Sequence, residues 1–404
     1  MPEGDAILIA AQSGRALAQA ARRAGLRPFV LDLFGDEDTL ALAEGYRPLP
    51  GRFGTGRLGG EAVLSGLEAL STLSRATPLG VVLGSGFEGA PDLMARIAAH
   101  HRLIGAPPET VAALKDPFAL AALCARLAIP HPAVTADAVS NRREWLLKRV
   151  GGSGGSHIRA ATAGPAPAGH YHQKRVPGRA HALNVLADGH DPAVLALTEQ
   201  WSTPSAVRPY RFAGALARGR DEKPAVAPAT LAAITEAVAR LVAATGLRGL
   251  ASADLLIEGA EWWLLEINPR PGATLDLLDR RETPLLAGHI EASLGRLPSV
   301  GCAPPDAAAS EICYAPRRYA PVPSLDWPDF ARDRPRAGSI VARDAPLCTV
   351  TVSGPEAAGL RQGLRDRARR IAALLDEGER VHGDRHQGAE HQRADGTADR
   401  TARR

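Results

Sequence analysis

Two carboxylates and one amide in segment 251–274 are the residues of this chain best suited to hold a metal ion. Two apolar runs in this segment flank the turn residues 258–261, which predicts a β-hairpin. Asp254 lies on the first strand and Glu266 and Asn268 on the second, so pairing across the turn brings the two acids together. Side-chain alternation is expected to place four residues of the second strand on one face: Trp262, Leu264, Glu266 and Asn268. Such oxygen ligands suit Mg²⁺, which proteins usually hold together with substrate phosphates; the alternative is a set of solvated acids at strand ends.

A glycine–serine loop behind a lysine-bearing strand offers a way to bind those phosphates. The strand is expected at 145–150 and carries Lys148, and only Gly and Ser occupy 151–156. Backbone N–H groups free of bulky side chains can surround phosphate oxygens. The loop is not a P-loop, because no Gly-Lys-Ser/Thr ends it, and its composition is also typical of a flexible linker. Its place directly behind Lys148 favours phosphate binding, and Arg270 adds a planar donor for a phosphoryl group or oxyanion.

Composition narrows the class of protein. The chain has 404 residues, more than one hydrophobic core usually supports, so two or three domains are expected. Its 45% hydrophobic and 23% charged content is ordinary for a globular protein, and a net charge of +4 does not indicate nucleic-acid binding. The 4 cysteines have no metal-ligand spacing, and no apolar run is long enough for a membrane span. We therefore expect a soluble, cytoplasmic protein with reduced thiols and with no nucleic-acid or membrane partner.

The order of the expected elements indicates an α/β protein. Residues 1–108 are expected to form a doubly wound, Rossmann-like domain, because buried-strand signals alternate with helical ones. The turn after the first strand contains a single glycine rather than G-x-G-x-x-G, so a dinucleotide site is only weakly supported. The expected elements are strands at 6–11, 28–33 and 79–83 and helices at 15–24 and 91–101.

A second domain with mixed α and β elements is expected at 109–300, followed by a β-rich appendix at 301–377. In the second domain, strands are expected at 170–176, 180–187 and 208–216, and helices at 118–127, 229–245 and 285–294. In the appendix, strands are expected at 311–319, 339–342 and 348–352, and a helix at 355–375. From 378 to 404 the chain is polar and almost free of aliphatic residues, so we expect a disordered tail.

Taken in order, these parts resemble the ATP-grasp superfamily of carboxylate–amine ligases. The resemblance spans roughly residues 110–290, and its most specific part is Leu-Glu-Ile-Asn-Pro-Arg-Pro-Gly at 265–272. It implies an N-terminal partner domain, an α+β ATP-grasp domain with a mobile lid around 118–180, and an appendix similar to the C-terminal region of biotin-carboxylase-like members. The matching positions are Lys115, Lys148, the 151–157 loop, Gln173, Asp254, Glu266, Asn268 and Arg270.

The resemblance implies a role for each matching residue. ATP is the implied nucleotide, with one or two Mg²⁺ ions, or Mn²⁺ as an alternative, on Asp254, Glu266 and Asn268. Arg270 and Lys148 are the implied catalytic residues. The implied nucleotide-binding residues are Lys115, Lys148, Gly152, Ser153, Gly154, Gly155, Ser156, Gln173, Lys174, Val176 and His181. Ala180 stands where the family often carries a Glu for the ribose hydroxyls; this departure puts ribose recognition in doubt, and His181 is one candidate substitute.

The implied reaction joins a carboxylate to an amine through an acyl phosphate and releases ADP and phosphate. Similarity is nearest to tyramine/tyrosine–glutamate ligase-like enzymes of methanofuran-type coenzyme biosynthesis. Arg208, Arg211 and Thr274 are candidates for binding an acidic substrate such as glutamate; alternatively, the arginines are merely exposed on a strand edge. Two other functions stay open, a carboxylase that uses carboxyphosphate and a non-catalytic nucleotide-binding protein. The expected partners are small carboxylate and amine substrates, with a homodimer as an open possibility.

Overall fold

The N-terminal part of the chain is built on a parallel sheet. The computed structural model describes residues 4–51, 53 and 58–401, with side chains as far as 380. The sheet has the order β3-β2-β1-β4-β5 and all its pairs are parallel, as a Rossmann-like domain requires. Its strands are β1 (Ala6–Ala10), β2 (Arg27–Asp32), β3 (Gly45–Pro48), β4 (Val81–Leu83) and β5 (Leu103–Ile104).

Helices cover both faces of this sheet. They are α1 (Arg15–Arg23), α2 (Glu37–Leu42), α3 (Gly60–Ser74) and α4 (Pro91–Ala98). The three expected strands and the helices α1 and α4 are confirmed, because each is a clear apolar run. The short α2, β3 and β5 were not predicted, nor was α3, whose apolar residues are interrupted by Gly, Ser and Thr.

A second sheet carries the predicted hairpin at one end. Its order is β14-β13-β10-β11-β12-β15-β17-β16, with antiparallel pairs throughout. Helices α7 (Pro228–Thr245), α8 (Leu275–Leu278) and α9 (Leu285–Ser293) accompany it. Its strands are β10 (Arg179–Asp188), β11 (Pro192–Ser202), β12 (Phe212–Ala217), β13 (Arg248–Glu258), β14 (Glu261–Asn268), β15 (Ala307–Tyr314), β16 (Ala331–Arg332) and β17 (Pro346–Gly354). The structure is thus mixed α/β, with one parallel sheet and antiparallel sheets.

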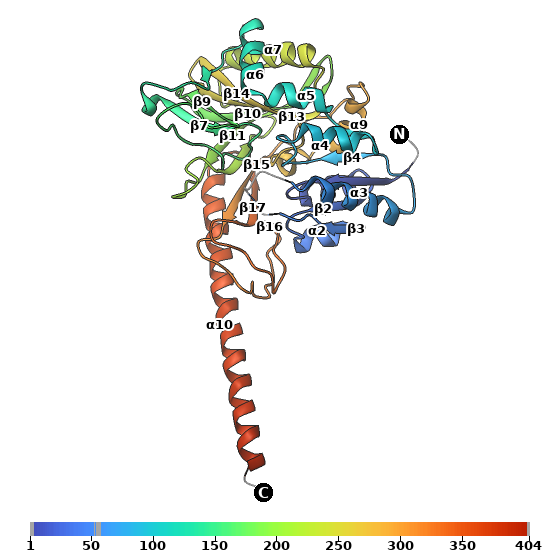
Figure 1. Cartoon of the computed structure of the whole chain (residues 1–404), viewed down its shortest axis with the longest axis vertical. Helices are drawn as coiled ribbons and strands as arrows, with labels where there is room; N and C mark the ends of the chain where they lie inside the picture. Colours follow the sequence, from blue (N-terminus) through green and yellow to red (C-terminus); the bar gives the residue numbers. More distant parts are fainter. Residues whose placement is uncertain (1–3, 52, 54–57, 402–404) are drawn as a thin grey trace.

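A third, smaller sheet lies beside the hairpin (Figure 1), and its Gln173 donates to the carbonyl of Leu265. Its order is β6-β9-β7-β8, and it falls within the segment expected to be a lid. Two helices precede this sheet, and Asp116 lies between them. Its carboxylate caps the second helix by accepting from the N–H groups of Phe118 and Ala119. The elements are α5 (Pro108–Lys115), α6 (Pro117–Arg126), β6 (Val134–Thr135), the 3₁₀ turn η1 (Arg142–Glu144), β7 (Trp145–Arg149), β8 (Arg159–Ala160) and β9 (His170–Lys174).

The C-terminal strands extend the second sheet rather than forming a sheet of their own. β12 pairs with β15, so hydrogen bonding is continuous across the division expected at residue 300. The strand expected at 339–342 is reduced to a single bridge between Tyr319 and Val341. Helix α10 (Leu360–Thr401) packs on these strands through its first turns and then projects away from the molecule (Figure 1).

The length of α10 differs from the expectation for the tail. A helix ending near 375 and a disordered segment from 378 were expected, whereas the helix continues to Thr401. The tail has almost no apolar residues that could pack on a core. It also contains no proline, so nothing in its backbone prevents a helix. As far as residue 380, where the description of side chains ends, the buried positions of α10 are Leu360, Leu364, Ile371 and Leu375. That the tail adds nothing to stability remains a prediction.

One buried histidine fixes the parallel sheet against the second sheet. The backbone N–H of Leu250 donates to His289 Nδ1 at 2.8 Å, and His289 Nε2 lies 3.1 Å from the carbonyl of Ile104. Nδ1 must therefore be the acceptor and Nε2 the protonated nitrogen. Burial lowers the pKa of His289 to about 4, which keeps the ring neutral. A Cβ at Gly249 would lie 2.5 Å from this ring, so only glycine fits there.

Candidate active site

The predicted hairpin is present, and its register brings the two acids together. Asp254 on β13 is paired with Glu266 on β14, and Glu258 with Glu261 closes the turn. The expectation that Trp262 and Leu264 share a face with Glu266 and Asn268 is wrong. The register shifts between Asp254 and Leu255, so Leu255 pairs with Leu264 and one residue of β14 is extra. This bulge turns Leu264 into the core, whereas Glu266 and Asn268 stay on the face of Asp254.

Two lysines compensate the charge of this acidic pair. Lys115 at the end of α5 lies 3.7 Å from Glu266 and donates to Asn268 Oδ1 at 3.1 Å. Asn268 Nδ2 in turn donates to Asp254 Oδ2 at 3.0 Å. Burial and the charge of Glu266 raise the pKa of Asp254. Burial acts the same way on Glu266, but Lys115 and Lys148 outweigh it and lower the pKa of that carboxyl.

The oxygen set fits a magnesium ion that is completed by phosphates. Among the residues that the structure describes, no three His, Cys, Asp or Glu side chains group closely enough to hold a metal ion. The trio Asp254, Glu266 and Asn268 therefore supplies two carboxylates and one amide, which is too few for a closed protein site. Mg²⁺ usually binds in this way, through one or two carboxylates together with substrate phosphates.

A small cavity on the lysine side has the lining expected of a nucleotide phosphate site. Its walls include Lys115, Gly152, Gln173 and Glu266. Lys148 on β7 is buried and donates to Gln173 Oε1 at 3.1 Å. Burial lowers the pKa of Lys148, and Glu266 opposes this effect.

The positions expected to bind adenine and ribose are less clearly arranged. The N–H of Lys174 already donates to the carbonyl of Ala133, and its side chain is exposed. Val176 follows β9 and is half-buried. His181 on β10 is buried and its Nδ1 lies 3.0 Å from the carbonyl of Arg179. Their roles stay predictions.

The glycine–serine loop lies between that small cavity and a large one. Gly151 lines both, Gly152 lines the small cavity, and Ser153, Gly154 and Ser156 line the large one. The carbonyl of Gly154 accepts from the N–H of Phe212 at 2.9 Å. A Cβ at Gly155, where φ is +69°, would lie 1.9 Å from the carbonyl oxygen of Tyr210. Glycine is therefore required for the loop to dock in this closed position.

The large cavity has a volume of about 290 Å³ and lies where the two sheets meet. Asp254, Asn268 and Arg270 line it from the hairpin side, together with Thr274, whose hydroxyl donates to Asn184 at 2.8 Å. The opposite wall follows the carboxyl ends of β1, β2 and β4, where open α/β sheets usually bind ligands. Its residues there include Gln12, Ser13, Arg15, Phe34, Asp36, Gly84, Ser85 and Gly86.

Arg270 is aimed into the large cavity by a buried acid that sequence reasoning did not identify. Its Nε donates to Glu88 Oε1 at 2.6 Å, and Glu88 Oε2 accepts from the N–H of Gly86. Burial would raise the pKa of Glu88, but Arg270 and Lys115 reverse the shift and lower it. Arg270 and Glu88 are 182 positions apart, so no local pattern signals this pair.

The two arginines proposed for an acidic substrate do not themselves line the large cavity. Both precede β12 and neither is among the residues that line the large cavity. Arg208 and Arg211 donate to the carbonyl of Asp344, and Arg211 also pairs with the Asp344 carboxylate at 3.2 Å. The Arg211 guanidinium stacks 3.7 Å from the centre of the Tyr314 ring. These contacts tie the loop before β12 to the C-terminal strands. Arg208 also lies over Phe53, and both Phe53 and Tyr314 line the large cavity, so a role of the two arginines in substrate binding stays a prediction.

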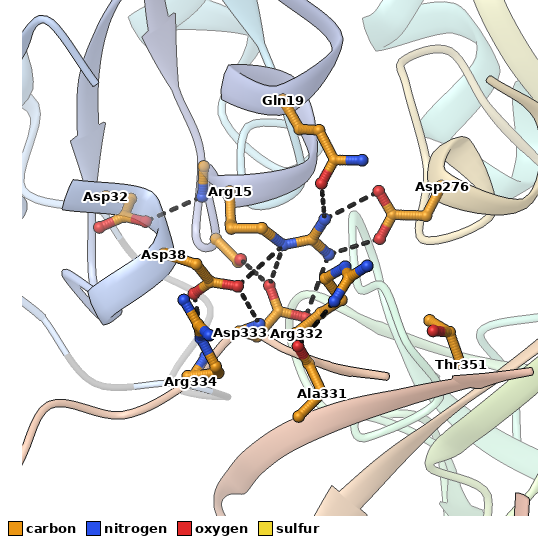
Figure 2. A network of polar contacts seen from close by, with 12 residues as sticks. Arg15, Gln19, Asp32, Asp38, Asp276, Ala331, Arg332, Asp333, Arg334 and Thr351 are labelled. Carbon is orange, nitrogen blue, oxygen red and sulfur yellow. Dashed lines mark hydrogen bonds and ion pairs between the residues drawn. The ribbon is translucent and has the colours of Figure 1, made fainter. Parts of the chain in front are cut away.

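Sequence reasoning also missed an acidic network across the cavity from the hairpin. Arg15 at the start of α1 donates to Asp276 Oδ1 at 2.8 Å and to Asp333 Oδ1 at 3.0 Å (Figure 2). Asp38 lies 3.9 Å from the same guanidinium. These partners are separated by up to 318 positions in the chain and meet only in the folded structure.

The central part of the chain is similar to a known domain family. Residues 118–274 match the model of the family described as the ATP-grasp domain. No curated protein matches the sequence.

Solved structures share the fold over nearly the whole length. Biotin carboxylase from Campylobacter jejuni, solved as a β-γ-ATP complex, has a TM-score of 0.66 at 14% identity, covering 93% of this chain and 91% of that one. L-amino acid ligase from Bacillus licheniformis has a TM-score of 0.64 at 15% identity, covering 94% and 98%. The biotin carboxylase domain of Hydrogenobacter thermophilus 2-oxoglutarate carboxylase, solved with MgADP and bicarbonate, has a TM-score of 0.65 at 12% identity, covering 92% and 89%. At these identities the likeness is one of fold.

No helix in the described part of the chain combines the length and apolarity that a membrane span needs.

Proposed function

We propose that this protein is an ATP-dependent ligase that joins a carboxylate to an amine through an acyl phosphate and releases ADP and phosphate. The observation that carries the proposal is the position of the acidic trio. Glu266 faces the small cavity with Lys115 and Gln173, whereas Asp254 and Asn268 face the large cavity. A phosphoryl group held at the trio therefore has the nucleotide on one side and room for a second substrate on the other.

The chain's own residues can position both halves of such a reaction. Lys115, Lys148 and the N–H groups of the 151–156 loop are placed to hold the phosphates of ATP, and Asp254, Glu266 and Asn268 to hold Mg²⁺. When bound, Mg²⁺ neutralises charge on the transferring phosphoryl group. The docked loop excludes water, which would otherwise hydrolyse an acyl phosphate.

Arg270 is placed to act on the substrate side. One of its terminal nitrogens donates to the carbonyl of Pro271, and Nε is held by Glu88. Among the described residues none accepts from its Nη2, so this nitrogen can donate to the carboxylate that attacks the γ-phosphorus. The same donor can stabilise the oxyanion that forms when the amine attacks the acyl carbon and phosphate leaves.

Product formation with Mg-ATP tests this proposal. ADP and phosphate would be measured across a matrix of acids and amines, including glutamate with tyramine or tyrosine and bicarbonate alone. ADP release that needs both an acid and an amine supports the ligase. ADP release with bicarbonate alone would favour the carboxylase reading, which the fold shared with biotin carboxylases keeps as the second candidate. Glutamate as the acid, and a place in methanofuran-type coenzyme synthesis, stay predictions that the same matrix tests.

A further inference from the structure

The wall of the large cavity opposite the hairpin carries more negative than positive charge. We call it the acidic wall and define it by Asp36, Asp276, Asp333 and Arg15, all of which line the cavity. Arg15 holds Asp276 through two nitrogens and Asp333 through Nε, and a further bond from Nη2 reaches Asp333 at 3.3 Å (Figure 2). Arg15 thus donates to two of the three acids of the wall, Asp276 and Asp333, and makes no hydrogen bond to the third.

Asp36 is that third acid, and its carboxylate has no partner among the residues that the structure describes. The residue is only 6% exposed, and no donor among the described residues bonds or pairs with its carboxylate. It stands directly before α2, where an Asp side chain ordinarily accepts from the first turn of the helix, but it makes no such bond. Its remaining exposure is to the cavity that it lines. A buried carboxyl group without a partner takes up a proton, whereas a cationic ligand beside it would stabilise the ionised form.

The surroundings select the kind of ligand. Burial, and then the charges of Asp333, Asp32 and Asp38, disfavour an ionised Asp36, and the charge of Arg15 acts against them; the partner that would let Asp36 ionise is therefore a cation. A metal ion does not fit, because Arg15 already holds Asp276 and Asp333, and Asp36 alone supplies too few ligands. Phe34 and Phe53 line the same cavity with ring centres 5.9 Å apart, and because the Arg208 guanidinium already lies over Phe53, Phe34 is left as the apolar surface. An organic ammonium matches both features.

We propose that the acidic wall is a subsite for an ammonium group of the substrate, with Asp36 as its counter-ion. That the ligand is a substrate rests on the proposed ligase function, whereas the binding of an ammonium group at this wall does not depend on it. The held nitrogen is not the attacking one, because a nucleophilic amine must be unprotonated and must reach the acyl phosphate at the hairpin side. The ligand therefore carries its ammonium in addition to its reacting group. It is either an amino acid used as the acid, or a diamine used as the amine.

Direct binding of matched compounds to the full-length protein tests the subsite without requiring turnover. Calorimetry would compare L-glutamate with glutarate, L-alanine with propionate, L-phenylalanine with 3-phenylpropionate, and 1,4-diaminobutane with butylamine. Each pair differs by one ammonium group. We expect at least one ammonium-bearing member to bind at least tenfold more tightly than its match; an amino acid would identify the acid substrate, and 1,4-diaminobutane the amine. No preference in any pair would overturn the proposal.

Two variants locate the effect. Asp36→Asn should remove the preference for the ammonium-bearing member while leaving MgADP affinity unchanged. Glu37→Gln removes the same charge from the next, exposed residue and should keep the preference. An Asp36→Asn protein that retains the preference would overturn the assignment to Asp36. If the unaltered protein does not bind MgADP, the proposed function is contradicted, but the comparison of ammonium-bearing ligands stays valid. The two failures are therefore distinguishable.

Discussion

The hairpin and the acidic wall are two acidic regions of one cavity, and they differ in how their charge is compensated. At the hairpin, Lys115 and Lys148 lower the pKa of Glu266, so the protein itself keeps one carboxylate ionised for a metal. At the acidic wall, Arg15 is used by Asp276 and Asp333, and burial together with the neighbouring acids raises the pKa of Asp36 to about 9. The comparison suggests that the hairpin is prepared before binding, whereas the wall is completed by its ligand.

The largest expected effect is at the hairpin. Glu266→Gln should reduce turnover by about 100-fold or more, because it removes a charge that acts on the transferring phosphoryl group. The protein should stay folded, since glutamine keeps the size of the side chain. Steady-state ADP release measures the effect, with Glu261→Gln at the exposed turn of the same hairpin as the control. Normal turnover of Glu266→Gln at ordinary Mg²⁺ would refute the metal assignment.

The loop between the two regions should have the next largest effect. Gly155→Ala places a Cβ against the carbonyl of Tyr210 and prevents docking. Turnover should fall by about 10- to 100-fold, since a misplacement of about 1 Å near the chemistry can cost that much. Gly164→Ala is the matched control, because its φ of +83° imposes similar strain but its Cβ meets nothing within 4 Å. Equal losses in the two variants would show that strain alone, and not docking, is responsible.

Asp36 in the acidic wall should make the stability of the protein depend on pH. The pKa of Asp36 is about 9 in the folded protein and ordinarily 3.8, so the folded state holds a proton that the unfolded chain releases across this range. Stability therefore falls as pH rises from about 4 to 9, by up to about 1.4 kcal/mol per pH unit. Asp36→Asn should weaken the fall in Tm between pH 5 and pH 8, and Glu37→Gln should not. Identical slopes for all three proteins would contradict the burial of an unpaired carboxyl.

The smallest effect is expected far from both regions. Deleting residues 381–404 leaves the four buried residues of the described part of α10 in place, of which Leu375 comes last. Tm and ADP release should both stay at the values of the full chain, as measured by scanning calorimetry and the turnover assay. A clear loss of either would show that the end of α10 contributes to the structure.

Local features of the site were predictable from the sequence, and long-range ones were not. The hairpin, Lys148 and the glycine–serine loop each follow from neighbouring residues, so strand and turn patterns identified them. The bulge was missed because register depends on the partner strand, and it reversed the expected face of Leu264. Strand β11 was missed because its polar residues interrupt the apolar pattern.

The same limit explains the residues that were missed or misplaced. Glu88 meets Arg270, and Arg15 meets Asp333, only through the packing of separate sheets. Arg208 and Arg211 have the right charge for an acidic substrate, yet in the fold both are hydrogen-bonded or ion-paired with Asp344. A charge can be read from the sequence, but whether it is already paired depends on the fold.

The fate of an oxygen atom tests the central claim most directly. The acid that supports ADP release would be supplied with ¹⁸O in its carboxylate, together with Mg-ATP and the amine, and the released phosphate would be analysed by mass spectrometry. If the carboxylate attacks the γ-phosphorus and phosphate later leaves the acyl carbon, each phosphate carries one ¹⁸O atom from the acid. ADP and amide formation with unlabelled phosphate would show that no acyl phosphate forms and would contradict the proposed ligase mechanism.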